Sequence, residues 1–222
     1  MYYILTPSQY DDAGYRDAYV TGLARLLDAL PATDSAGARL IFVSSTGVYG
    51  QDAGEWVDET SPTNPARFSG RRLLEGERLA ASHRGGHVVV RFAGIYGAGR
   101  DALIRRVRAG KPCAHHPARY TNRIHEADCV AILRHLGQLP APADTYIGSD
   151  SAPCTQCEVM DWLAGQLGCP RPPRATGASA GRRCRNARLL ASGYTLLYPD
   201  YRRGYSGALS RTSVPSAGSS EP

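Results

Sequence analysis

Chemistry that depends on a lysine has a single candidate in this chain. Among the 222 residues, Lys111 is the only lysine. A Schiff base, a phosphate-binding P-loop or a lysine paired with a catalytic tyrosine would all have to use it. It lies in Ala-Gly-Lys-Pro, which is typical of a loop after a helix and fits none of those three contexts.

Small polar side chains instead follow the predicted buried strands. Residues 40–44 and 88–92 are continuous apolar runs, typical of strands buried on both faces, and residues 2–5 form a shorter run. In open parallel α/β sheets, ligands bind beyond the carboxyl ends of such strands. The sequence therefore predicts one crevice lined by Leu5, Thr6, Ser44, Ser45, Phe92 and Ala93.

Helical segments must position these strands. Apolar periodicity predicts helices over 19–30, 70–83, 101–109, from His125 onward and over 159–167, with short strands at 145–147 and 194–198. Alternation of strand and helix predicts an α/β fold with an open parallel sheet. We expect residues 1–110 to form that sheet domain, 111–208 a smaller mixed lobe packed on it, and 209–222 a disordered tail.

Composition narrows the class of protein. The formal net charge is +6, and 42% of the residues are hydrophobic. No apolar run is long enough to span a membrane, and the arginines are scattered rather than clustered. We therefore expect a cytoplasmic protein with a small-molecule substrate, and neither a nucleic-acid nor a membrane partner.

Six cysteines include one pair with the spacing of metal ligands, Cys154 and Cys157. Cys169 and Cys184 do not repeat that spacing, so we expect no metal site. Since the N-terminus lacks the pattern of a secretory signal, we interpret the cysteines as reduced thiols.

Four short motifs resemble the extended short-chain dehydrogenase/reductase family, the NAD-dependent sugar epimerases and dehydratases. The motifs, which occur in the family's order within residues 1–170, are Ser44-Ser-Thr-Gly-Val-Tyr-Gly50, Val57-Asp-Glu-Thr-Ser-Pro62, Arg91-Phe-Ala-Gly-Ile-Tyr-Gly97 and Arg123-Ile-His-Glu-Ala-Asp128. The chain looks most like an atypical bacterial branch of epimerase-like proteins.

This resemblance implies a Rossmann-like sheet that binds NAD or NADP, with a small substrate lobe. It implies that Ser45, three residues before Val48, hydrogen-bonds the substrate oxygen. By motif position, the expected cofactor residues are Leu5, Thr6, Ser44, Arg71, Phe92, Ala93, Gly94 and Ile95. The expected substrate residues are Thr46, Tyr49, Arg100 and Arg123.

The chain departs from the family's catalytic Tyr-x-x-x-Lys. Aligning Glu75 with the family's glutamate puts Arg67 at the tyrosine position and Arg71 at the lysine position. Arginine stays protonated at neutral pH and does not shuttle a proton. Tyr49 and Tyr96 remain as alternative acid/base groups or as tyrosines of the crevice wall.

A second departure concerns the phosphate-binding glycine fingerprint, which has no match in residues 1–45. The chain opens at what resembles the family's fourth strand, so we expect an N-terminally truncated sheet, a misassigned start at Met1, and weak or absent dinucleotide binding. Residues 97–102 fit G-x-G-x-x-A, but they lie too far from the strand end and lack the downstream carboxylate.

Three hypotheses follow. The chain is an NAD(P)-linked epimerase, dehydratase or reductase acting on a sugar nucleotide or another hydroxyl or carbonyl compound. Alternatively, it is a pseudoenzyme that binds a dinucleotide as a scaffold or regulatory module. The third reading is a non-functional fragment of a longer reading frame, which would aggregate or depend on another protomer. A homo-oligomer is also left open.

Overall fold

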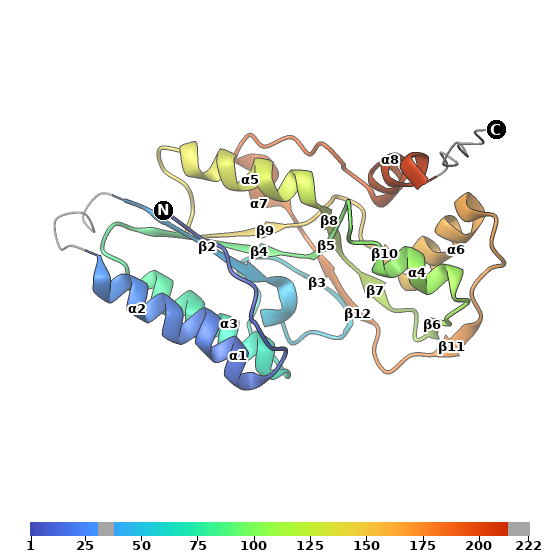
Figure 1. The fold of residues 1–222 in the computed structure, drawn as a ribbon, viewed down its shortest axis with the longest axis horizontal. Helices are drawn as coiled ribbons and strands as arrows, with labels where there is room; N and C mark the ends of the chain where they lie inside the picture. The colour runs from blue at the N-terminus through green and yellow to red at the C-terminus, as the bar shows by residue number, and fades with distance from the viewer. Residues whose placement is uncertain (31–37, 213–222) are drawn as a thin grey trace, which may run out of the picture.

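The computed structural model describes residues 1–30 and 38–212. Its centre is a parallel four-stranded sheet in the order β1-β2-β4-β9 (Figure 1). The strands are β1 (Tyr2–Tyr3), β2 (Leu40–Ser45), β4 (His87–Phe92) and β9 (Thr145–Gly148). This arrangement confirms the α/β fold with a parallel, Rossmann-like sheet.

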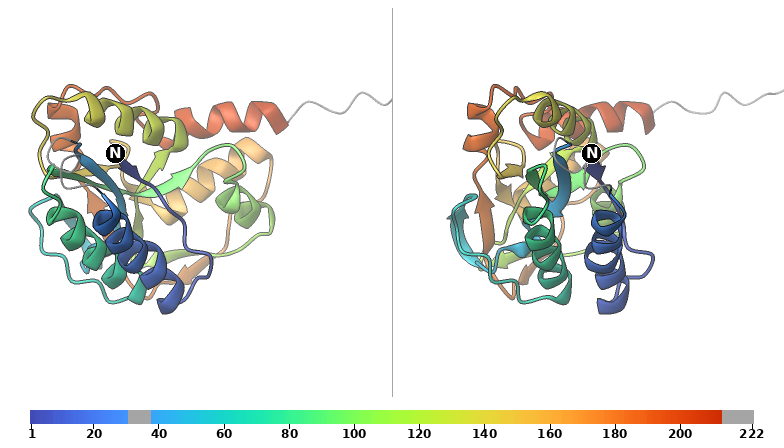
Figure 2. Two further views of the ribbon diagram at one scale, coloured as in Figure 1. Left: turned by 60° about the vertical axis from the view of Figure 1, so that its left-hand side comes forward. Right: turned by 90° about the vertical axis from the view of Figure 1, so that its left-hand side faces the viewer.

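Helices cover both faces of this sheet because its central strands are apolar on both sides. On one face lie α3 (Phe68–Ala81) and a continuous helix made of α1 (Asp12–Arg16), a π-helical turn (Asp17–Thr21) and α2 (Gly22–Ala29). Phe42 and Val89 belong to the core on that side, whereas Ile41 and Val88 pack with α5 on the other. Figure 2 shows α2 and α3 side by side beneath the sheet.

The opposite face is covered by α5 (Glu126–Gln138). The side chain of His125 caps this helix, because its Nδ1 accepts a hydrogen bond from the amide of Ala127 at 3.2 Å. The helix predicted from His125 onward is therefore confirmed.

A second cluster of apolar residues holds the C-terminal lobe together. It packs α4 (Ala102–Arg108) and α6 (Gln156–Leu167) against α8 (Tyr201–Thr212), at the side of the molecule away from α2 (Figure 1). The short α7 (Ala187–Ala191) lies beside β9.

Short strands connect this lobe to the central sheet. A second sheet has the order β10-β7-β12-β3, and two strand pairs, β11 with β6 and β5 with β8, complete the set. Their bounds are β3 (Ala53–Val57), β5 (Gly94–Tyr96), β6 (Cys113–His116), β7 (Tyr120–Thr121), β8 (Arg123–His125), β10 (Cys154–Thr155), β11 (Arg174–Thr176) and β12 (Gly181–Cys184). Since β3 pairs with β12, part of the N-terminal segment belongs to the same sheet as the lobe.

The strand predicted at 194–198 is wrong. That segment is irregular, and the carboxylate of Asp128 accepts hydrogen bonds from its hydroxyl and amide groups at Tyr194, Leu197 and Tyr198. A side chain therefore satisfies amides that a neighbouring strand would otherwise pair. The tail predicted from 209 is helical over its first four residues, because α8 continues to Thr212; the rest of the predicted tail, residues 213–222, lies outside the described part of the chain.

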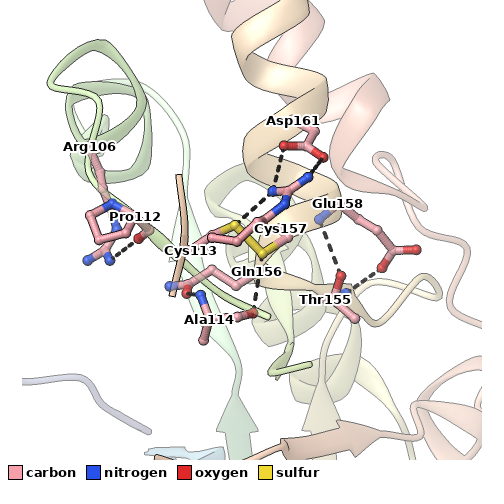
Figure 3. The surroundings of a disulfide bond; sticks show 10 residues. Arg106, Pro112, Cys113, Ala114, Thr155, Gln156, Cys157, Glu158 and Asp161 are labelled. Atoms are coloured by element: carbon pink, nitrogen blue, oxygen red, sulfur yellow. Dashed lines mark hydrogen bonds and ion pairs between the residues drawn. A yellow bond between two sulfur atoms is a disulfide. The ribbon is translucent and has the colours of Figure 1, made fainter. Parts of the chain in front are cut away.

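The expectation that all cysteines are free thiols is wrong for two of them. Cys113 and Cys157 form a disulfide that joins β6 to the first turn of α6 (Figure 3). Beside it, Nη1 of Arg174 lies 2.9 Å from Cys113 Sγ, and the same guanidinium binds Asp161. Pairing by sequence spacing missed this bond because Cys113 lies 44 residues from its partner.

Within the described residues, no helix has the length and apolar character needed to cross a membrane.

Candidate active site

The predicted crevice is present as a cavity of about 620 Å³ at the carboxyl ends of β1, β2 and β4. Most of the residues expected to bind cofactor or substrate line it together. They are Leu5, Thr6, Ser44, Ser45, Tyr49, Phe92, Ala93, Ile95 and Arg100. Parallel strands bring these residues together because their carboxyl ends share one edge of the sheet.

Ser45 lies at the end of β2, where the chain turns into a short 3₁₀ helix (Thr46–Val48). Its Oγ accepts a hydrogen bond from the amide of Gly47 at 3.1 Å, which fixes the side chain as the cap of that turn. The turn is also held from the side of α3: a Cβ added to Gly70 would collide with the carbonyl oxygen of Gly47. Residue 70 must therefore be glycine for α3 to approach this close.

A buried ionic network includes Ser44, the residue before Ser45. Ser44 donates through Oγ to Oε1 of Glu77 at 2.6 Å. The same carboxylate accepts two hydrogen bonds from Arg91, which comes from β4. Less than a tenth of each of the two charged side chains is exposed. Helix α3 and the ends of β2 and β4 are therefore fastened together beside the cavity.

Tyr49 belongs to this network rather than to a proton-transfer pair. Its hydroxyl accepts a hydrogen bond from Nη1 of Arg91 at 2.8 Å and donates one to the carbonyl of Asp58 at 2.9 Å. Burial raises the pKa of Tyr49 to about 12. A phenol that keeps its proton and already donates it is a wall residue, not a base at neutral pH.

Tyr96, the other tyrosine considered as an acid or base, lies outside the cavity lining. Burial raises its pKa, and its ring stacks on that of Tyr205 in α8.

Arg67 and Arg71, which occupy the positions of the family's tyrosine and lysine, lie in different places relative to the cavity. Arg67, the residue just before α3, lines the cavity. Arg71 lies one turn into the helix, outside the lining, and donates through Nη1 to the carbonyl of Ala66 at 2.7 Å. The structure therefore does not place Arg71 where a cofactor residue was expected.

Three further expected residues do not line the cavity either. Gly94 and Thr46 are adjacent to residues that do, but are not in the lining. Arg123 is buried, and its guanidinium donates to Cys154 Sγ at 3.0 Å and Thr121 Oγ1 at 2.7 Å. The expectation that Arg123 reaches the substrate site is therefore corrected: the side chain folds into the C-terminal lobe, where a tyrosine ring covers it.

Sequence reasoning missed the contribution of the C-terminal lobe to this cavity. Arg119 lines it from just before β7, Ser179 from just before β12, and Arg182 from within β12. Arg119 is far from the other two along the chain, and no spacing rule relates it to them. The available signal was the basic run at 182–185, which alone did not indicate which arginine turns inward.

The cavity lies where the nicotinamide end of a dinucleotide was expected. Small and apolar residues at strand ends, such as Ala93 and Ile95, offer a surface for a flat ring beside Ser45. The described residues do not offer a phosphate cradle in the turn at 97–102, because the amide of Ala98 already donates to the carboxylate of Glu126 at 2.8 Å. A carboxylate in that position repels a pyrophosphate.

Comparison with known proteins gives matches to a family model, to a curated protein and to solved structures. Residues 21–112 match a family model described as the RmlD substrate binding domain. Over 111 residues, the chain is 40% identical to protein YeeZ of Escherichia coli strain K12; the match covers 49% of this chain and 38% of YeeZ. The chain thus matches well under half of the length of that curated relative.

Among solved structures, one from Methylobacillus flagellatus, assigned there as an NAD-dependent epimerase/dehydratase, is 39% identical with a TM-score of 0.79. The match covers 90% of this chain and 73% of that one. The enzyme WbmG of Bordetella bronchiseptica, solved with NAD and UDP, shares the fold at 19% identity and a TM-score of 0.75, covering 94% of this chain and 71% of WbmG. Other structures of this fold hold NAD or NADPH.

Proposed function

Because the chain belongs to the NAD-dependent epimerase/dehydratase family of extended short-chain dehydrogenases/reductases, we propose that its cavity binds NAD or NADP and a small hydroxyl or carbonyl substrate. The observation that carries this proposal is Ser45. It stands at the family's serine position, at the end of a buried parallel strand, and its side chain faces the cavity.

The dinucleotide, when bound, supplies the hydride acceptor or donor. Leu5, Thr6, Phe92 and Ala93 would hold its nicotinamide end, since they line the cavity from the strand ends. The Ser45 hydroxyl would bind and orient the substrate oxygen. Sugar nucleotides are the substrate class we propose first, because UDP accompanies NAD in WbmG.

Arg67 takes a different role from the tyrosine it replaces. A guanidinium stays charged at neutral pH, so it does not remove a proton. Placed on the cavity wall, it can stabilise the negative charge that develops on the substrate oxygen. The reaction would therefore depend on electrostatic stabilisation more than in a tyrosine-dependent relative.

The test is turnover of UDP-glucose with NAD, followed as nicotinamide absorbance and by product analysis. Ser45→Ala should abolish most of the turnover, whereas Ser69→Ala, which removes another cavity-wall hydroxyl, should leave it largely unchanged. Equal rates in both variants would contradict the role of Ser45.

A second candidate is a dinucleotide-binding module without turnover. The position of Arg71 favours it, because that side chain is tied to Ala66 outside the cavity and does not replace the family's lysine. Saturable NADH binding with no turnover of any sugar nucleotide would support this reading over the enzyme.

A further inference from the structure

The wall that the C-terminal lobe adds to the cavity is cationic. Arg119 precedes Tyr120, and Arg182 follows Gly181; these two neighbours are paired between β7 and β12, so both arginines come to the same side of the cavity. With Arg67 and Arg100, four arginines of the described segments line the cavity, against one described carboxylate, Asp52.

Arg182 is held in place without an ionic partner. Its Nε donates to the carbonyl of Gln51 and its Nη1 to the carbonyl of Thr46, both at 2.8 Å. These bonds fix the guanidinium plane, and among the described residues Nη2 has no hydrogen-bond acceptor. Within residues 1–30 and 38–212, no carboxylate lies within ion-pair distance of Arg182 or Arg119.

The electrostatic cost of this arrangement is visible at Arg182. Burial lowers the pKa of its guanidinium; Cys184, Asp52 and Glu55 act in the opposite direction, and Arg119 makes the smallest contribution, which lowers the pKa. A half-buried cation that is fixed but unpaired is costly unless an anion joins it. Arg100 differs, because Glu126 lies 3.8 Å from its guanidinium.

We propose that Arg182 and Arg119 form a recognition site for an anionic group of the substrate, a carboxylate or a phosphate located a few bonds from the reacting oxygen. The anionic group is placed near the reacting oxygen because the Arg182 guanidinium donates to the carbonyl of Thr46, the residue that follows Ser45. This inference rests on the proposed role of Ser45 as the oxygen-binding group. It favours a sugar acid, hydroxy acid or sugar phosphate over a neutral polyol.

The two arginines provide separate tests of the inference. Arg182 also donates a hydrogen bond to the carbonyl of Thr46 in the turn after Ser45. Replacing Arg182 could therefore weaken anion binding by displacing that turn. The side chain of Arg119 is exposed and makes no hydrogen bond to any residue that the structure describes, so Arg119→Gln removes charge with little structural change. Arg185→Gln is the matched control, because Arg185 lies at the end of β12 but stacks on the exposed ring of Trp56 outside the cavity.

The experiment is calorimetric titration of the whole chain with D-gluconate, inorganic phosphate and D-glucose, at constant ionic strength. We expect an anion to bind more tightly than glucose. Arg119→Gln and Arg182→Gln should each weaken its binding by about tenfold or more, and Arg185→Gln should not. Binding of gluconate alone indicates a carboxylate site, and binding of phosphate alone a phosphate site.

Three results would overturn the inference: no anion binds better than glucose, Arg185→Gln has the same effect as Arg119→Gln, or Arg182→Gln weakens glucose and anion equally. The last result would assign Arg182 to the turn alone. Failure of the proposed function is distinguishable, because anion binding requires neither NADH nor turnover. Anion binding that depends on both arginines, in a protein without turnover, would leave this inference standing.

Discussion

Arg91 in β4 and Glu77 in α3 form a buried ion pair with two hydrogen bonds, of 2.7 Å (Nη2–Oε2) and 3.0 Å (Nε–Oε1). The pair lies behind Ser44, whose hydroxyl shares the same carboxylate. It therefore connects the stability of the sheet to the position of the neighbouring Ser45.

Removing one partner of this pair should be strongly destabilising. Glu77→Gln leaves the Arg91 guanidinium buried without a counter-charge, which should lower the free energy of unfolding by about 3–5 kcal/mol. Urea denaturation followed by circular dichroism measures it. The control is Glu75→Gln, which breaks the more exposed pair with Arg72 and should cost at most about 1 kcal/mol. Equal losses in the two variants would contradict the buried network.

The disulfide should contribute measurably to stability. Cys113 and Cys157 close a loop with a sequence separation of 44 residues, and Cys113→Ser should lower the free energy of unfolding by about 2–4 kcal/mol. Reductant should lower the melting temperature of the wild type and not of the variant. Cys169→Ser, at a free and partly exposed cysteine, should behave as the wild type. Insensitivity of the wild type to reductant would refute the bond.

Asp150 should make the protein less stable as the pH rises. Burial raises the pKa of its carboxyl to about 7, with Arg123 acting against the rise and Asp128 and Asp200 adding to it. The unfolded value is about 3.9, so the folded state holds the proton more tightly. Stability contributed by this group is complete below about pH 4 and is lost as the pH passes about 7.

Between about pH 5 and about pH 8 the loss should be about 3 kcal/mol, and Asp150→Asn should remove it. Urea unfolding at these two pH values measures the difference. The same pH dependence in the wild type and in Asp150→Asn would show that other groups cause it.

Tyr49 should be important for stability and dispensable for chemistry. Tyr49→Phe removes the hydroxyl that binds Arg91 and Asp58, and it should cost about 1–3 kcal/mol because a buried guanidinium loses an acceptor. Turnover and NADH affinity, measured below the melting temperature, should change little. Loss of turnover with unchanged stability would instead make Tyr49 the acid/base group.

The central sheet could be predicted from the sequence because each buried strand is a continuous apolar run. β2 and β4 match the predicted strands to within one residue at each end, and their ends carry Ser45 and Ala93 into the cavity as expected. Short strands such as β3 and β12 were missed, because two to five residues carry too little periodicity.

The directions of the side chains in the site were harder to predict from the sequence than the strands that carry them. Arg123 and Arg182 both belong to short strands of the C-terminal lobe, yet one is buried against Cys154 and the other turns into the cavity. Their directions depend on pairing between distant strands, which sequence spacing does not reveal. The same reason explains why the disulfide and the hydrogen bonds that Asp128 accepts from Tyr194, Leu197 and Tyr198 were not predicted.

The most direct test of the proposed function is titration of NADH into this chain, followed by nicotinamide fluorescence, with reduced nicotinamide mononucleotide and AMP as competitors. We propose that the described cavity holds the nicotinamide end, and the described residues offer no phosphate cradle in the turn at 97–102. We therefore predict saturable NADH binding that the mononucleotide displaces and AMP does not. No saturable fluorescence change, or displacement by AMP alone, would contradict the account.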